Sequence, residues 1–127
     1  MQKNIVIVED ERDTGEMFAE MLRLRGYLAH NAFAGTAALS LIAEKQPDVI
    51  LLDLMMPDMD GWDVYHQLKA NEQLKNIPVI IITAKSQEID RVLGLHIAKV
   101  DDYICKPFHP QELLDSMDRV FTRLKTS

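Results

Sequence analysis

Short runs of apolar, mostly β-branched residues alternate along the chain with segments in which apolar residues recur at helical spacing. The runs at 5–8, 49–52 and 79–82 contain no polar residue. Strands covered on both faces have this pattern, so the three runs predict a parallel sheet between two layers of helices. Two further strands are predicted at 27–32, at the edge of the sheet, and at 103–105.

The segments between these runs carry helix signals. Asp13 and Glu16 have the spacing of a capping box at the start of the first helix, and Gly26 is the predicted end of that helix. Its predicted apolar stripe is Met17, Phe18, Met21, Leu22 and Leu24. The remaining helices are predicted at about 36–45, after Asp60-Gly61, near 87–95, where the pattern is weakest, and from Pro110 onward.

The order of these elements is a strand followed by a helix, repeated five times. Right-handed crossovers turn such a chain into an α/β, doubly wound, three-layer sandwich. For a sheet of this size we expect the flavodoxin-like strand order 2-1-3-4-5, an order already known for such folds rather than derived from spacing. The 127 residues fit a single domain spanning 1–127.

Composition narrows the classes of function. The formal net charge of −6 disfavours contact with a phosphate backbone, so we expect no direct nucleic-acid contact. No apolar run reaches the roughly 18 residues needed to span a membrane, and the four apolar residues at 5–8 are too few for a signal peptide. A single cysteine favours a reducing compartment, so a cytoplasmic location is expected.

Charged and hydroxyl side chains follow four of the predicted strands. Glu9 and Asp10 follow the first, Asp53 the third, Thr83 the fourth and Lys106 the fifth. In the expected strand order the first and third strands are neighbours, so the three carboxylates should converge and favour a hard divalent cation, Mg²⁺ first. A carboxylate beside a metal and a lysine can act as a nucleophile toward phosphorus, and Asp53 ends the central strand. The alternative is that each acid is only a solvated strand end or a helix cap.

These residues stand within motifs that resemble the receiver domain of two-component response regulators, the CheY-like superfamily. Each fragment alone is weak, but in this order and at these separations they are highly specific. The matching fragments are IVEDE at 7–11, DLMMPDMDG at 53–61, Thr83-Ala84, Asp101-Asp102-Tyr103 and Lys106-Pro107-Phe108.

The resemblance implies a phosphorylation-controlled signalling module rather than an enzyme with an external substrate. Asp53 would accept a phosphoryl group from a phosphohistidine on a sensor histidine kinase or a phosphotransfer protein. Asp10 and Asp53 would bind Mg²⁺ directly, the backbone carbonyl of Met55 would be a third protein ligand, and Glu9 would act largely through water. Bulky Met55 would also screen attacking water, which predicts slow loss of phosphate.

The resemblance also implies a switch. Lys106 and Thr83 would bind phosphoryl oxygens, and Tyr103 would turn inward as Thr83 moves toward the phosphate. This would remodel the face made by the fourth helix, fifth strand and fifth helix, and signal to an output domain or a downstream protein. The chain is interpreted either as a free-standing regulator or as the receiver of a larger protein.

The sequence departs from the family pattern in two places that matter for this face. The stretch 96–100 contains no glycine where relatives commonly have one, and it is one residue longer. Arg91 and Glu112 could pair in a phosphorylation-dependent homodimer through the face, but Ser116 and Asp118 stand where dimerising regulators usually carry basic residues. Ser116 and Asp118 therefore argue against this homodimer.

Three other functions are alternatives to this interpretation. A phosphatase of the haloacid dehalogenase class needs a second aspartate two residues after the nucleophile, where this chain has Met55. A flavodoxin-like cofactor binder needs a Gly-, Ser- and Thr-rich phosphate loop, where this chain has Glu9-Asp10-Glu11. The third alternative is an interaction domain that no longer reacts, and the complete set of acidic, Thr and Lys residues argues against it.

Overall fold

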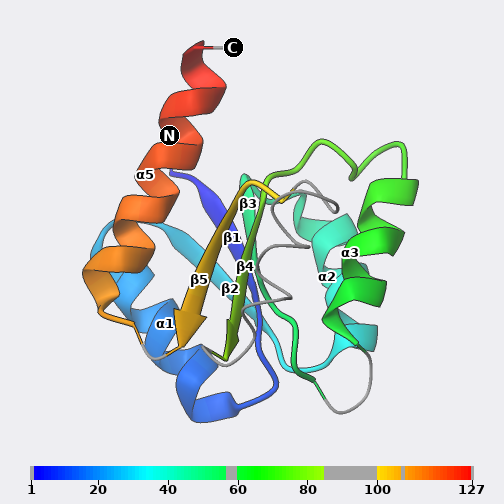
Figure 1. The fold of residues 1–127 in the computed structure, drawn as a ribbon, viewed down its shortest axis with the longest axis horizontal. Coiled ribbons are helices and arrows are strands. Elements are labelled where there is room, and N and C mark those ends of the chain that lie inside the picture. Colours follow the sequence, from blue (N-terminus) through cyan, green and yellow to red (C-terminus); the bar gives the residue numbers. More distant parts are fainter. Residues whose placement is uncertain (1, 57–59, 85–99, 107, 127) are drawn as a thin grey trace.

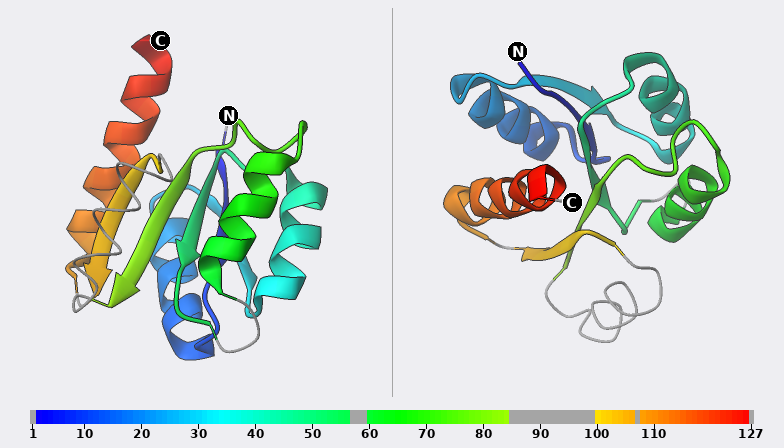
Figure 2. Two further views of the ribbon diagram at one scale, coloured as in Figure 1. Left: turned by 45° about the vertical axis from the view of Figure 1, so that its right-hand side comes forward. Right: turned by 90° about the horizontal axis from the view of Figure 1, so that it is seen from above.

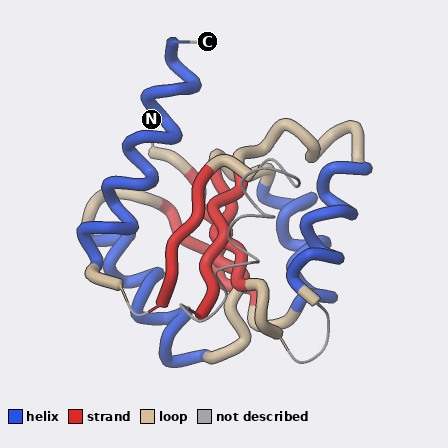
Figure 3. Tube along the Cα trace, viewed as in Figure 1, coloured by secondary structure: helices blue, strands red, loops and turns tan. Residues whose placement is uncertain are grey.

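The computed structural model describes residues 2–56, 60–84, 100–106 and 108–126. Five parallel strands form one sheet in the order β2-β1-β3-β4-β5, which confirms the predicted topology. Helices cover both faces of this sheet, and the loops gather at its two ends (Figures 1 and 3). The strands are β1 (Asn4–Val8), β2 (Leu28–Ala32), β3 (Val49–Asp53), β4 (Val79–Ala84) and β5 (Asp102–Lys106).

The helices of the described residues form two pairs on opposite faces of the sheet (Figure 2). Helices α1 and α5 cover one face, and α2 and α3 cover the other. The predicted helix near 87–95 lies outside the described residues. The bounds are α1 (Arg12–Leu24), α2 (Gly35–Lys45), α3 (Gly61–Ala70) and α5 (Pro110–Thr126).

Alternate residues of each strand divide the core into two hydrophobic clusters. Val6 and Val8 of β1 point toward α2 and α3, whereas Ile5 and Ile7 point toward α1 and α5. The same alternation holds for β3 and β4, because successive strand side chains leave opposite faces of the sheet. Every one of the twelve residues in the three apolar runs is buried, which explains why the runs lack polar positions.

Helix α1 differs from the prediction at its start. It begins at Arg12, with Glu11 as the extended N-cap residue, and no side-chain capping bond forms. Asp13 therefore lies inside the first turn, where its charge complements the helix dipole, and the capping box predicted from Asp13 and Glu16 is wrong. Glu11 instead accepts a hydrogen bond from the Thr14 hydroxyl.

The predicted end of α1 is confirmed. Gly26 has a φ of 91°, its N–H donates to the carbonyl of Arg23, and the Tyr27 N–H donates to that of Leu22. These paired bonds form the Schellman arrangement that glycine favours after a helix.

The predicted apolar stripe of α1 is too wide. Phe18 and Leu22 are buried and Met21 is half-buried, but Met17 is 59% exposed and Leu24 is 77% exposed. The buried face is completed by two small residues, Gly15 and Ala19. The face that packs on the sheet is therefore rotated away from Met17 and Leu24.

Candidate functional site

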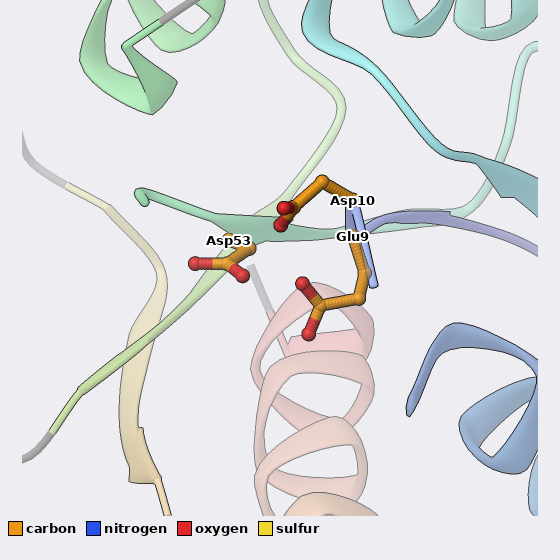
Figure 4. Close-up of side chains that lie close together, drawn as sticks. All are labelled: Glu9, Asp10 and Asp53. Atoms are coloured by element: carbon orange, nitrogen blue, oxygen red, sulfur yellow. The ribbon is translucent and has the colours of Figure 1, made fainter. Parts of the chain in front are cut away.

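Three carboxylates meet at the carboxyl end of the sheet. Glu9 and Asp10 follow β1, and Asp53 is the last residue of β3. The two strands are neighbours, with Val8 opposite Leu52, so their ends place the three side chains together. One oxygen from each lies within 4.8 Å of the others, and Figure 4 shows the three side chains directed toward one another. The structure thus brings together the acids that the sequence nominated.

Burial distinguishes the three acids. Glu9 is 2% exposed and Asp53 is 5% exposed, whereas Asp10 is half-buried at the mouth of the cluster. Backbone hydrogen bonds fix both strand ends: the Glu9 N–H donates to Ala32, and the Leu54 N–H donates to Ile82 over 3.2 Å. The carboxylates are therefore held by the sheet itself rather than by a flexible loop.

Lys106 reaches the cluster from β5, the outer neighbour of β4. It is the last residue of β5 and is paired with Ala84. Its Nζ donates to Oδ2 of Asp53 at 3.2 Å and also donates to Oε1 of Glu9. One ammonium group therefore bridges two buried carboxylates that come from two other strands.

The cluster holds more negative than positive charge, and this excess shifts the pKa values of its side chains. Burial is the main cause that raises the pKa of Glu9 to about 8, and the neighbouring Asp53 acts in the same direction. Burial alone would lower the pKa of Lys106, but its bonds to Glu9 and its attraction to Asp53 outweigh this and raise it. The lysine stays charged, and the Glu9 carboxyl takes up a proton below about pH 8. A bound cation would displace that proton.

Asp53 itself is oriented by the turn that follows it. Its Oδ1 accepts a hydrogen bond of 2.9 Å from the N–H of Met55. The Met55 side chain is 55% exposed beside the buried carboxylate, whereas that of Met56 is buried in the core. The hydrogen bond therefore fixes Oδ1 of Asp53, while the Met55 side chain stays at the surface. The role of the Met55 carbonyl as a metal ligand stays a prediction.

Gly61, which the sequence assigns to the turn before α3, packs against the backbone at the end of β3. Its N–H donates to the carbonyl of Leu54 at 3.0 Å. A Cβ atom on Gly61 would lie 2.4 Å from Cα of Leu54 and 2.7 Å from the carbonyl oxygen of Asp53. Helix α3 therefore begins against the backbone of the candidate nucleophile. In the sequence, this close approach is marked by a glycine directly after the helix-capping residue Asp60. The Asp60 side chain accepts a hydrogen bond from the Trp62 N–H.

The two predicted switch residues lie on neighbouring strands. Thr83 belongs to β4, where it pairs with Cys105, and its side chain lies outside the described part of the structure. Tyr103 of β5 is buried with the core cluster that faces α2 and α3. Their parts in a switch stay predictions.

The doubly wound fold and the acidic cluster with its lysine define an α/β module suited to phosphoryl chemistry. The model of the response regulator receiver domain matches residues 5–118. The chain belongs to the response regulator receiver domain family, whose members are signalling modules of two-component systems.

Solved structures support this assignment. The receiver domain of Francisella response regulator 1452 is 30% identical, with 97% of this chain and 99% of that chain covered and a TM-score of 0.86. The receiver domain of a signal transduction histidine kinase from Syntrophus aciditrophicus is 32% identical, with coverages of 98% and 94% and a TM-score of 0.86. The chemotaxis response regulator CheY4 of Vibrio cholerae is 26% identical, with coverages of 94% and 99% and the same TM-score of 0.86. Among the described residues, none of the helices is long and apolar enough to cross a membrane.

Proposed function

We propose that Asp53 accepts a phosphoryl group from a phosphohistidine on a sensor histidine kinase or a phosphotransfer protein, in a reaction that depends on Mg²⁺. The observation that carries the proposal is the ammonium of Lys106, 3.2 Å from Oδ2 of Asp53, at the edge of a cluster of three carboxylates. The site would act in the cytoplasm.

In the proposed transfer, a carboxylate oxygen of Asp53 attacks the phosphorus of the donor and forms a P–O bond. The P–N bond to the donor histidine breaks, and the imidazole nitrogen leaves with the bonding electron pair. Such a transfer depends mainly on positioning and on neutralising charge on the phosphoryl oxygens. Lys106 would exchange a carboxylate partner for one of those oxygens, with the Thr83 hydroxyl as a second donor.

Asp10 and Asp53, the Met55 carbonyl and, largely through water, Glu9 are the proposed Mg²⁺ ligands. The donor set fits a hard cation, because it consists of oxygens only and carries excess negative charge. Bound Mg²⁺ supplies neutralisation of the charge that the carboxylates and the phosphoryl group share. Phosphorylation then replaces the single negative charge of the Asp53 carboxylate by a phosphoryl group that carries nearly two, and biases the face around β5 and α5 toward an output domain or partner.

The test follows Trp62, the half-buried tryptophan in the first turn of α3. Its fluorescence is recorded as beryllofluoride is added in saturating Mg²⁺, and intact mass is measured after incubation with acetyl phosphate. We expect a fluorescence change and a single phosphoryl mass increase in the wild type, and neither in Asp53→Asn.

Asp60→Asn is the matched control, because it changes an exposed aspartate at the start of the same helix whose side-chain oxygen can still cap it. This variant should behave as the wild type does. An unchanged mass in the wild type, or the same mass increase in Asp53→Asn, would contradict the proposal. Sustained turnover of ordinary phosphate esters would instead favour a phosphatase.

A further inference from the structure

Helix α5 buries the hydroxyl group of Ser116 among apolar side chains. Leu113, Met117 and Val120 line the inner side of the helix and are 0% exposed, and Ser116 beside them is also 0% exposed. Its Oγ donates a hydrogen bond of 2.6 Å to Oδ2 of Asp102. A buried hydroxyl is costly without a partner, so this bond secures the placement of both residues.

Asp102 is the first residue of β5, and its carboxylate collects three donors. Besides the Ser116 hydroxyl, Oδ2 accepts from Arg119 Nη2 at 2.9 Å, and Oδ1 accepts from the Tyr103 N–H at 2.8 Å. Burial would raise the pKa of Asp102, but these three bonds outweigh it and the pKa lies below its ordinary value. The start of β5 is thus fastened to α5 by an ionised carboxylate.

Lys106 stands at the other end of the same strand. In the described sheet, β5 pairs with β4 alone, so beyond that ladder its tilt depends on what holds it from α5. The four steps from Asp102 to Lys106 span about 13 Å at roughly 3.3 Å per residue. A tilt of about 5° would therefore move the far end by about 1 Å, which is enough to break a hydrogen bond or to misplace a catalytic group.

Apart from the ion pairs that Lys106 itself makes with Glu9 and Asp53, the far end has a weaker fastening. The ring of Phe108, two residues beyond Lys106, lies 5.4 Å from that of Phe18 in α1, centroid to centroid. This apolar contact allows more sliding than a carboxylate with three directed donors. The Asp102 end therefore contributes most to the orientation of the strand.

We propose that Ser116 is a positioning residue for phosphoryl transfer: it holds Asp102, and through β5 it keeps the Lys106 ammonium within reach of Asp53. The proposal rests on the proposed function, because it needs a reaction in which Lys106 takes part. It places a determinant of the rate on the inner face of α5, at the opposite end of β5 from the chemistry.

The test is a double-mutant cycle in the full chain. Ser116→Ala, Lys106→Ala and the double variant are incubated with acetyl phosphate and saturating Mg²⁺, and the initial phosphorylation rate is followed by intact mass. We expect Ser116→Ala to slow the reaction about three- to tenfold with the Mg²⁺ dissociation constant changed less than twofold, since Lys106 binds no metal. In the Lys106→Ala background the same change should slow it less than 1.5-fold.

Two further variants separate positioning from loss of structure. Ser116→Thr keeps the hydroxyl and should restore at least half of the wild-type rate. Ser40→Ala removes an exposed serine from α2 and should leave the rate unchanged. Amide hydrogen exchange of the variants provides a second measurement: Ser116→Ala should speed exchange along β5 and leave β1 unaffected.

The outcomes are distinguishable. A wild type that is phosphorylated, together with a Ser116→Ala effect that is absent or equal in both backgrounds, overturns the positioning role alone. Faster exchange throughout the sheet would assign Ser116 to general stability and also overturn it. A wild type that stays unmodified overturns the proposed function and this inference with it.

Discussion

Replacing Gly61 by alanine should destabilise the protein, although alanine is the better helix former. The added Cβ would lie 2.4 Å from Cα of Leu54 and 2.7 Å from the Asp53 carbonyl oxygen. Both are backbone atoms at the end of a buried strand, so neither can rotate away as a side-chain atom could. The start of α3 must move by about 1 Å to reach ordinary van der Waals separation.

The expected change in the free energy of unfolding has three contributions, two unfavourable and one favourable. Overpacking of this kind costs about 1–3 kcal/mol. The hydrogen bond from the Gly61 N–H to Leu54, 3.0 Å long, would be weakened at a cost of up to about 1 kcal/mol. Helix propensity returns less than about 1 kcal/mol. The sum is a destabilisation of about 2 kcal/mol.

Two other glycines provide matched controls. Gly26 has open space around it but a φ of 91°, so Gly26→Ala should cost about 1–2 kcal/mol through backbone strain alone. Gly15 lies inside α1, where an added Cβ would come to 3.3 Å from the Phe33 ring and 3.4 Å from the Asn31 side chain. These side chains can shift, so the gain in helix propensity should leave Gly15→Ala near neutral, within about 0.5 kcal/mol.

Urea unfolding at constant pH in excess EDTA measures all three variants against the wild type. The expected order of stability is Gly15→Ala above Gly26→Ala above Gly61→Ala. A Gly61→Ala protein as stable as the wild type would refute the reasoning, because it would show that the strand end and α3 can separate at no cost. In Gly61→Ala, Mg²⁺ affinity should also fall, since the turn that orients Asp53 moves with the helix.

Three further predictions concern single residues. Because the pKa of Glu9 is raised from 4.5 to about 8, its contribution to stability is complete below about pH 4.5 and is lost as the pH rises to about 8. The unfolding free energy of the metal-free protein should decline over this pH range. Saturating Mg²⁺ or the Glu9→Gln substitution should remove the decline. Met55→Asn should shorten the half-life of the phosphorylated protein, measured by intact mass after the donor is removed, and an unchanged or longer half-life would contradict the screening role of Met55. Gln46 holds a φ of 47° at the end of α2, so Gln46→Gly should raise the unfolding free energy by up to about 1 kcal/mol in urea, whereas a loss would show that its side-chain bond to Ala43 matters more.

Much of the fold could be predicted from the sequence, because burial on both faces leaves a strand no polar position. The runs at 5–8, 49–52 and 79–82 therefore located β1, β3 and β4 to within two residues. The start of α1 was misplaced because several acidic residues in succession offer competing caps, and only the backbone conformation selects Glu11.

The acidic site could be predicted to the extent that it follows from topology. Once β1 and β3 are neighbours, Glu9, Asp10 and Asp53 must converge, and no side-chain detail is needed. The bridge from Lys106 to both Glu9 and Asp53 depends on rotamers and burial, which no periodicity encodes. The same is true of Ser116, which stands where dimerising regulators usually carry a basic residue and which the structure buries against Asp102.

The site is assembled from β1, β3 and β5, which stand near the beginning, the middle and the last quarter of the chain. No fragment cut between β1 and β3 retains a complete set of the proposed ligands, and none cut between β3 and β5 keeps Lys106 beside them, so a cation bound there stabilises the native fold as one unit. A chain divided between α2 and β3 should consequently recover metal affinity only when its two pieces reassociate. In such a divided chain, metal binding would measure how far the two pieces have reassociated.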